Sequence, residues 1–276
     1  MSFSGSQVIS ETFKTVRDRF GPMLGIWATF FGIQMALVVL LGFGMAGTAA
    51  AGLASENPLA MGAGMIVWFI LFYVMVILVG FAQNGALLAI SSPLKKLTFG
   101  EAFNAGIRCA LPMLGVLVLI VFGYLAFALV AGIFTAVLGK VGLGLLVILL
   151  IPVLVFVGAR LFLVFPVLAI EKVVNPITAI KRSWELTHGN VIKIILVSLV
   201  LVVASAILFA LLILPFLGTI FAAEAGAAPS IGAGLGLLVG WLLLIVVLSL
   251  VWAAFPSVMH AELAGSTGED FGATFG

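Results

Sequence analysis

The most constraining feature of this sequence is a series of apolar segments, each longer than the about 20 residues that an α-helix needs to cross a bilayer. Six such segments follow one another at residues 22–47, 61–90, 110–138, 141–170, 191–223 and 231–260. Hydrophobic residues make up 64% of the 276 residues and charged residues only 8%, whereas soluble proteins carry about a quarter charged residues. We therefore predict an all-α membrane protein with six transmembrane helices, forming one polytopic domain over residues 1–276.

The basic residues predict which side of the membrane each connection faces. They precede the first span and fill the connections after the second and fourth spans: Lys14, Arg17, Arg19, Lys95, Lys96, Arg108, Lys172, Lys181, Arg182 and Lys193. Lys140 is the exception, in a connection on the opposite side. Because lysine and arginine are enriched in cytoplasmic loops, both termini and the two long charged connections are predicted to be cytoplasmic. The mixed charges before the first span do not resemble a cleavable signal peptide, so that span is expected to remain in the mature protein.

A short sequence recurs at the start of the first and third spans. Residues 11–25 read ETFKTVRDRFGPMLG and residues 101–115 read EAFNAGIRCALPMLG, with Glu, Phe and PMLG in the same register. Residues 175–196 form a weaker third copy that keeps the organisation more than the letters. We expect three pseudo-repeated units, each with a short helix and two spans, at about residues 3–92, 93–170 and 171–262, followed by a flexible tail over 263–276.

Each unit is expected to begin with a short amphipathic helix on the cytoplasmic side. Ser4 and Thr98 are each followed three residues later by Gln or Glu, which is the capping-box pattern. Asn175 before Pro176 is a typical helix start. Apolar stripes are predicted along the first and third helices, at Ile9, Phe13, Val16 and Phe20 and at Ile177, Ile180 and Trp184. Such helices either pack beneath the bundle or lie in the membrane interface.

The segment after the fourth span carries the most distinctive motif. Arg160 and Pro166 form an R-x5-P pattern, and Ala179 then leads into RSWELTHGN at residues 182–190. This segment resembles the membrane domain found beside glycerophosphodiester phosphodiesterases and the related YciC-type inner-membrane proteins of bacteria. Those families have six spans and an A-x2-RSW-x-L-x-x-G segment after the fourth.

The resemblance implies a bacterial inner (cytoplasmic) membrane location and an interfacial or motif role for Ala179, Arg182, Ser183, Trp184, Thr187 and Gly189. It does not imply phosphodiesterase activity, because in those proteins that activity belongs to a separate soluble domain.

Arg160 lies inside the fourth apolar segment, where an unpaired charge is unfavourable. It precedes Glu171 by eleven residues, which is roughly 16 Å along a helix. This depth overlaps that of Gln83 and Asn84 in the second span, so we expect these three residues to form a polar cluster. The cluster is either a structural clamp between spans two and four or a binding site for a phosphate or carboxylate headgroup. Arg160 can alternatively snorkel toward the interface.

The sequence lacks a recognisable catalytic constellation. It contains no P-loop, HExxH or GxSxG motif and no intramembrane series of acids and histidines. Its two histidines are far apart, and His260 is expected at a span end in the interface. Cys109 is the single cysteine and is expected to be a small buried residue. We therefore expect no metal and no cofactor, and the net charge of +2 is too small to suggest nucleic acid.

Our leading hypothesis is a non-enzymatic membrane protein that supports the cell envelope or a membrane complex. Its expected partners are membrane lipids and other membrane-protein subunits. The alternative is a transporter or lipid-handling protein with an anion-binding cavity around Arg160. A membrane enzyme that acts on lipid ranks last, because no acid, base or metal set supports it.

Overall fold

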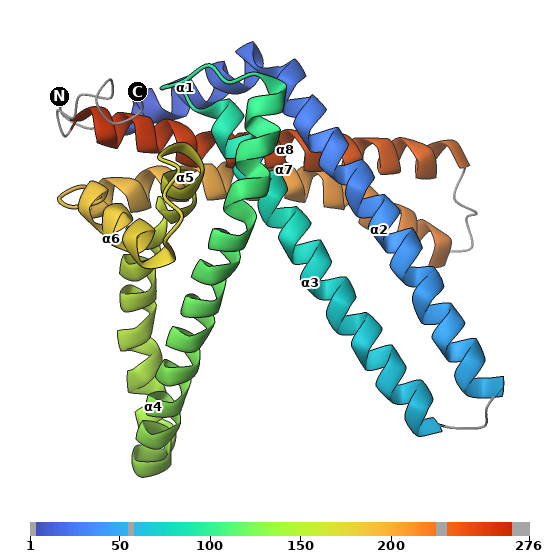
Figure 1. Cartoon of the computed structure of the whole chain (residues 1–276). Helices are drawn as coiled ribbons and strands as arrows, with labels where there is room; N and C mark the ends of the chain where they lie inside the picture. Colours follow the sequence, from blue (N-terminus) through green and yellow to red (C-terminus); the bar gives the residue numbers. More distant parts are fainter. Residues whose placement is uncertain (1–3, 55–57, 225–230, 267–276) are drawn as a thin grey trace.

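The computed structural model describes residues 4–54, 58–224 and 231–266, and these residues form eight helices and no strand (Figure 1). The helices are α1 (Gly5–Asp18), α2 (Phe20–Ala54), α3 (Pro58–Ser91), α4 (Phe99–Leu161), α5 (Val164–Ile170), α6 (Pro176–Leu186), α7 (Val191–Glu224) and α8 (Ile231–Ser266). The predicted all-α class is confirmed.

Six segments of the described chain are long and apolar enough to cross a membrane, which confirms the predicted number of spans: Phe20–Ala54, Gly62–Ser91, Phe99–Gly139, Ile148–Ile170, Val191–Gly218 and Gly234–Gly265. The molecule is therefore a multi-pass integral membrane protein. The third span and the first part of the fourth belong to α4, which folds back on itself where Gly139 takes a φ of 58° and a ψ of −145° (Figure 1). Glycine suits this position because a side chain would be strained there.

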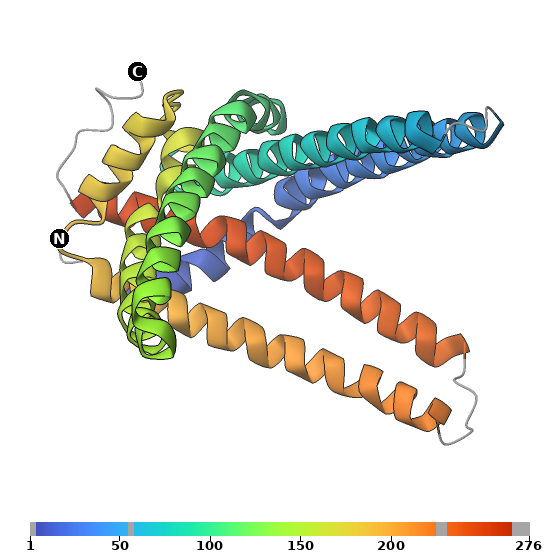
Figure 2. The same cartoon turned by 90° about the horizontal axis from the view of Figure 1, so that it is seen from below.

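The helices form three hairpins that diverge from a common hub (Figures 1 and 2). The hairpins are α2 with α3, the two arms of α4, and α7 with α8. The hub consists of α1, α5 and α6 together with the adjoining ends of the hairpins. Its fully buried side chains come from every part of the chain: Met23, Ile26, Leu88, Ile90, Met113, Leu163, Ile194, Leu250, Phe255, Met259 and Leu263. The hydrophobic core thus lies at one end of the molecule.

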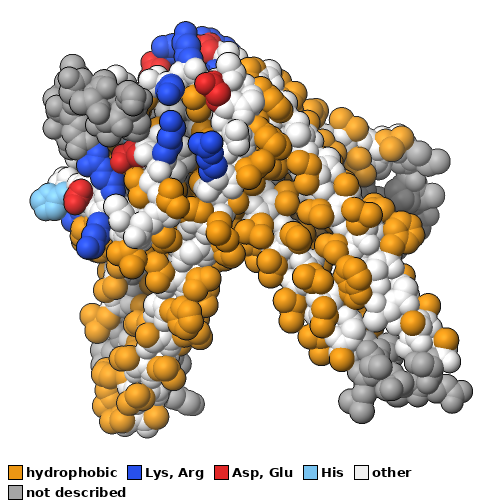
Figure 3. Space-filling view, viewed as in Figure 1, with side chains coloured by type: hydrophobic (Ala, Val, Ile, Leu, Met, Phe, Trp, Pro, Cys, Tyr) orange, Lys and Arg blue, Asp and Glu red, His pale blue; other side chains and the backbone are white. Residues whose placement is uncertain are grey.

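The spans themselves are covered very little by the rest of the protein. Between 6% and 22% of the residues in the most apolar window of each span are buried. Lysine, arginine and the acids gather over the hub in Figure 3, whereas hydrophobic side chains dominate the hairpins. This division is what a bilayer requires, because the hairpins offer apolar surface to lipid and the hub offers charge to water and headgroups.

Small residues bring α3 and α4 together where they enter the hub. A β-carbon added at Gly106 would lie 2.7 Å from Cβ of Ala86 and would also meet the carbonyl oxygen of Ala82. On α3, a β-carbon at Gly85 would meet Sγ of Cys109, which is buried as predicted. Close backbone approach of this kind is typical of helix packing in membranes.

The PMLG repeat occupies equivalent positions in the hub. Met23 and Met113 are both fully buried. A β-carbon at Gly25 would lie 3.5 Å from the ring of Phe99, and one at Gly115 would lie 2.8 Å from Cγ of Pro176. Phe99 and Pro176 are the first residues of α4 and α6. Each PMLG glycine therefore packs against the first residue of the next unit's leading helix.

The contacts close into a ring at Gly5, the first residue of α1, which packs against Val197 of α7. Such cyclic contacts are expected of a threefold repeat, although duplication itself stays a prediction.

Two details of the predicted units need correction. The second amphipathic helix is not separate, because α4 runs without a break from Phe99 into the third span. The tail begins later than residue 263, because α8 continues to Ser266; residues 267–276 lie outside the described residues.

The predicted apolar stripe of α1 is wrong in part. The buried residues of this helix are Val8, Thr12, Thr15 and Val16, whereas Phe13 is 53% exposed. Val8, Thr12 and Thr15 are small enough for α1 to pack closely against α8, and this packing turns Phe13 outward. Ser4 precedes the helix, but its side chain contacts Ser6 Oγ and makes no capping hydrogen bond.

In the third predicted amphipathic helix, α6, the buried face also differs from the predicted apolar stripe. Ala179, Ser183 and Leu186 are buried, whereas Ile177 and Trp184 are exposed. The expected cap is present, since Oδ1 of Asn175 accepts hydrogen bonds from the backbone N–H groups of residues 177 and 178. The helix is thus attached to the hub and also presents apolar side chains to its surroundings.

Candidate functional site

The turn after α5 positions most of the polar side chains of the hub. Glu171 ends α5, and the next residue, Lys172, takes a φ of 56°. This left-handed conformation is unfavourable for a residue with a side chain, by about 1–2 kcal/mol. It reverses the chain so that α6 packs back onto the second arm of α4, where Phe156 and Trp184 meet edge to face with ring centroids 6.2 Å apart.

Glu171 is the centre of a partly buried polar network that joins three elements. Its Oε1 lies 2.7 Å from Nε2 of His260 on α8, and its Oε2 accepts a hydrogen bond of 3.2 Å from Nε of Arg182 on α6. His260 is fully buried. His260 is thus packed inside the hub and is not an exposed residue at a span end, whereas its depth relative to the membrane stays a prediction. Sequence reasoning missed the Glu171–His260 contact, since 89 residues separate its partners.

Arg160 ties α4 to the C-terminal turn of α6. Its Nη1 donates to the carbonyl oxygen of Trp184 at 2.9 Å and to Oγ1 of Thr187 at 3.5 Å. Oγ of Ser183 donates in return to the carbonyl oxygen of Arg160 at 2.7 Å. Since the last carbonyls of a helix lack partners within the helix, a cation there both satisfies them and opposes the helix dipole.

Two aromatic rings complete the surroundings of the Arg160 side chain. Its guanidinium carbon lies 5.3 Å from the centroid of the Phe156 ring and 5.1 Å from that of Trp184. The residue is 8% exposed, and its Nε has no hydrogen-bond partner among the described residues. Cation–π contacts and carbonyl bonds thus stabilise this buried charge in place of a carboxylate.

The predicted cluster of Arg160 with Gln83 and Asn84 is not formed. Oε1 of Gln83 accepts a hydrogen bond of 3.2 Å from Nε2 of Gln34 on α2, and Asn84 is exposed. The turn at Lys172 brings the carbonyls of α6 to Arg160, so the guanidinium bonds there instead of to the second span.

The other residues of the recognised motif also have defined places. Ala179 is fully buried where α6 packs on the hub. Gly189 follows α6 with a φ of 77°, the conformation that glycine favours where a helix stops. Arg182 lies in the polar network, and Ser183, Trp184 and Thr187 surround Arg160. The structure therefore brings the motif together as the joint between α4 and α6.

Arg19 plays a similar part at the end of α3. Its Nη1 donates to the carbonyl oxygens of Ile90 at 2.6 Å and of Ser92 at 2.9 Å. Partial burial lowers the pKa of this guanidinium from its usual value. Arg160 and Arg19 thus cap the C-terminal ends of two hub helices, α6 and α3.

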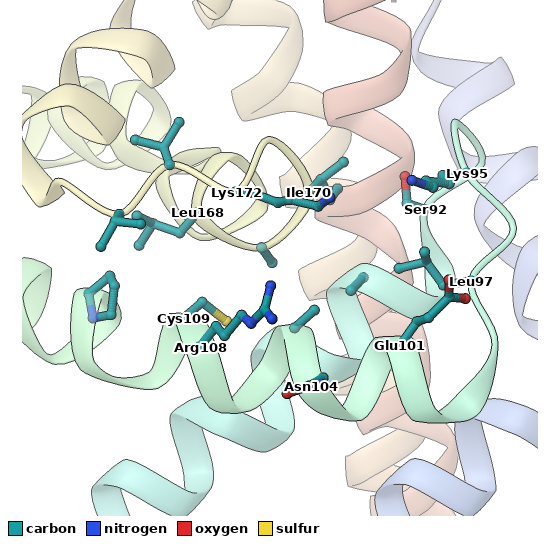
Figure 4. A pocket seen from close by; sticks show the side chains of 16 residues that line it. Ser92, Lys95, Leu97, Glu101, Asn104, Arg108, Cys109, Leu168, Ile170 and Lys172 are labelled. Carbon is teal, nitrogen blue, oxygen red and sulfur yellow. The ribbon is translucent and has the colours of Figure 1, made fainter. Parts of the chain in front are cut away.

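A pocket of about 350 Å³ opens beside these joints, between the α3–α4 connection, the first turns of α4 and the α5–α6 connection (Figure 4). Each of these segments supplies one cation to its lining, namely Lys95, Arg108 and Lys172. In Figure 4, Arg108 rises from α4 toward the connection that carries Lys172. The sequence showed these residues only as part of the basic bias of the connections; their convergence depends on the fold.

Two further polar side chains of the pocket, Glu101 and Ser92, differ in whether they have hydrogen-bond partners. Glu101 is held by the predicted capping box, in which its Oε2 accepts from the backbone N–H and the hydroxyl of Thr98, both at 2.8 Å. Ser92 is 1% exposed, and its Oγ has no hydrogen-bond partner among the described residues. Buried hydroxyls are nearly always hydrogen-bonded, so this group is a candidate ligand donor.

Within the described part of the chain, no group of three or more His, Cys, Asp or Glu side chains is placed to hold a metal ion. No protein-family model, curated protein or solved structure matches this chain.

Proposed function

We propose that this protein is a non-enzymatic protein of the bacterial inner membrane that binds membrane lipids and partner helices between its three hairpins and supports the envelope or a membrane complex. The observation that carries the proposal is the contrast between a well-packed hub and spans of which at most 22% is buried. Apolar helix faces in a bilayer are covered by lipid tails or by other helices. Because the hairpins diverge, they do not cover one another (Figure 2).

Photo-crosslinking in native membranes tests this proposal. A photoreactive residue is placed at Phe122 of α4 or at Leu208 of α7, both of which are exposed. We expect adducts with lipid or with another protein, identified by mass spectrometry. The matched control is Met259 in the hub core, where only adducts within the chain are expected. Adducts at Phe122 and Leu208 that join the hairpins of one chain would instead show a closed bundle and contradict the proposal.

The hub is proposed to lie on the cytoplasmic side, as the basic residues predict. Cysteine labelling in a Cys109→Ser background tests this orientation. Ser10→Cys, on the exposed side of α1, is expected to react only after the cells are permeabilised. Ser55→Cys, between α2 and α3, is expected to react from outside intact cells. The opposite pattern would invert the topology.

The motif at residues 179–189 supports a proposed relationship to the membrane domains found beside glycerophosphodiester phosphodiesterases and to the YciC-type proteins. The alternative function, a transporter or lipid-handling protein with an anion cavity around Arg160, has less support. Its guanidinium already bonds to α6 and packs against two aromatic rings, so little of its surface is left for a ligand.

A further inference from the structure

We propose that the basic pocket beside the α5–α6 turn binds the phosphate group of an anionic ligand, held by Lys95, Arg108 and Lys172 and by the hydroxyl of Ser92. This inference rests on the proposed lipid-binding function and names a chemical class of ligand for it. A membrane phospholipid and a soluble phosphate ester share this chemistry, and the experiment below separates them.

The charges of the pocket favour an anion. None of the three cations is held by a hydrogen bond or an ion pair to the described residues, although each lines the same pocket of about 350 Å³. Glu101 is the carboxylate of the lining; its Oε2 accepts from Thr98, and its negative charge also acts on Lys95 and Lys172, so one acid stands against three cations. The lining thus keeps an excess of positive charge at the end of the molecule where the charged side chains gather (Figure 3).

Ser92 supplies a second and independent indication. It lines the pocket, is 1% exposed, and keeps an Oγ without a partner among the described residues. Its own carbonyl is already held by Arg19, so the backbone around the hydroxyl is fixed. A buried hydroxyl in a fixed position is a donor that a bound oxygen atom would satisfy.

Phosphate fits this donor set better than a carboxylate does. Its oxygens can accept from several donors at once, which matches three cations that come from different directions. The planar fork of Arg108 suits two of these oxygens, and the lysines act as point charges. Leu111, three residues after Arg108 along α4, is exposed, so the acyl chain of a phospholipid can lie along α4 toward the bilayer.

The test measures thermal unfolding of the purified full chain in detergent, with added phosphatidylglycerol, phosphatidylcholine or inorganic phosphate. We expect phosphatidylglycerol to raise the unfolding temperature of the parent protein and phosphatidylcholine to have less effect. The variant Arg108→Gln/Lys172→Gln should bind phosphatidylglycerol more weakly, by roughly fivefold for each cation removed. Lys193→Gln removes an exposed hub cation outside the pocket and should respond almost as the parent does.

Ser92→Ala separates a ligand contact from a structural role. Loss of an unpaired buried hydroxyl should keep or raise the unfolding temperature without ligand, while the response to phosphatidylglycerol falls. A response to inorganic phosphate that depends on Arg108 and Lys172 supports the site with a soluble ester as its ligand. A parental phosphatidylglycerol response in the double variant, or in Ser92→Ala if the double variant does not fold, overturns the inference. Crosslinking at Phe122 tests the hairpins and not this pocket, so a failure of the proposed function can be distinguished from a failure of this inference.

Discussion

Nε2 of His260 lies 2.7 Å from Oε1 of Glu171, and this contact joins the last turns of α8 to the turn that follows α5. The same carboxylate accepts from Arg182 of α6 through its second oxygen. Glu171 therefore joins α6, which follows it closely in sequence, to α8, which lies far along the chain. Because Glu171 is largely shielded from solvent, the contact is sensitive to the loss of either hydrogen-bond partner.

Glu171→Gln is expected to destabilise the protein by about 1.5–3 kcal/mol, because Arg182 and the buried His260 lose their shared carboxylate. Chemical unfolding in detergent, followed by tryptophan fluorescence, measures the change. The control is Glu185→Gln, since Glu185 is 68% exposed and lies 3.8 Å from Nη1 of Arg182, so only a small change is expected. Parental stability in Glu171→Gln would show that the network does not hold the hub together.

Arg160→Met is expected to lower stability by about 1–3 kcal/mol, because the carbonyl of Trp184 and the hydroxyl of Thr187 lose a donor. Arg160→Lys should recover part of the loss, since a lysine keeps the charge but lacks the planar fork. Thermal unfolding of the parent and both variants is the measurement, and the unfolding temperature should fall in the order parent, Arg160→Lys, Arg160→Met.

Gln83→Leu is the informative partner for Arg160→Met. Gln83 bonds to Gln34, so its replacement should add to the effect of Arg160→Met without coupling. A strong coupling between the two substitutions would indicate that Arg160 and Gln83 interact, as their similar depth along the helices predicts. It would contradict the hydrogen-bond partners that the structure gives these residues.

Gly106→Val is expected to destabilise the α3–α4 crossing by about 2–3 kcal/mol, because its side chain would meet Ala82 and Ala86. Gly123→Ala, further along the same helix, has nothing within 4 Å of its added β-carbon. That control should be neutral or slightly stabilising, since alanine favours a helix over glycine by about 1 kcal/mol. Equal unfolding temperatures for the two variants would argue against the close crossing.

Asn175→Ala is expected to reduce stability by about 1 kcal/mol, because two backbone N–H groups at the start of α6 lose their acceptor. Ser4→Ala provides a matched comparison at the start of α1, where the serine side chain makes no capping hydrogen bond. Little change is expected there. If the two substitutions have the same effect on the unfolding temperature, the difference in capping is not real.

Local features of this protein could be predicted from its sequence. The six apolar segments, the capping box at Thr98 with Glu101 and the cap at Asn175 all appear where they were expected. Each depends on residues within a few turns of one helix or on the composition of one segment. Such features require no knowledge of how the helices pack.

Tertiary structure decided which polar side chains meet. Depth along the helix placed Arg160 level with Gln83, but depth does not specify rotation about the helix axis or the direction of the chain that follows. The left-handed turn at Lys172 brings α6 onto Arg160 and so determines its partners. Glu171 and His260 become neighbours only when α8 packs against that turn. Contacts between distant segments depend on the packing of the whole hub, and no local pattern in the sequence encodes that packing.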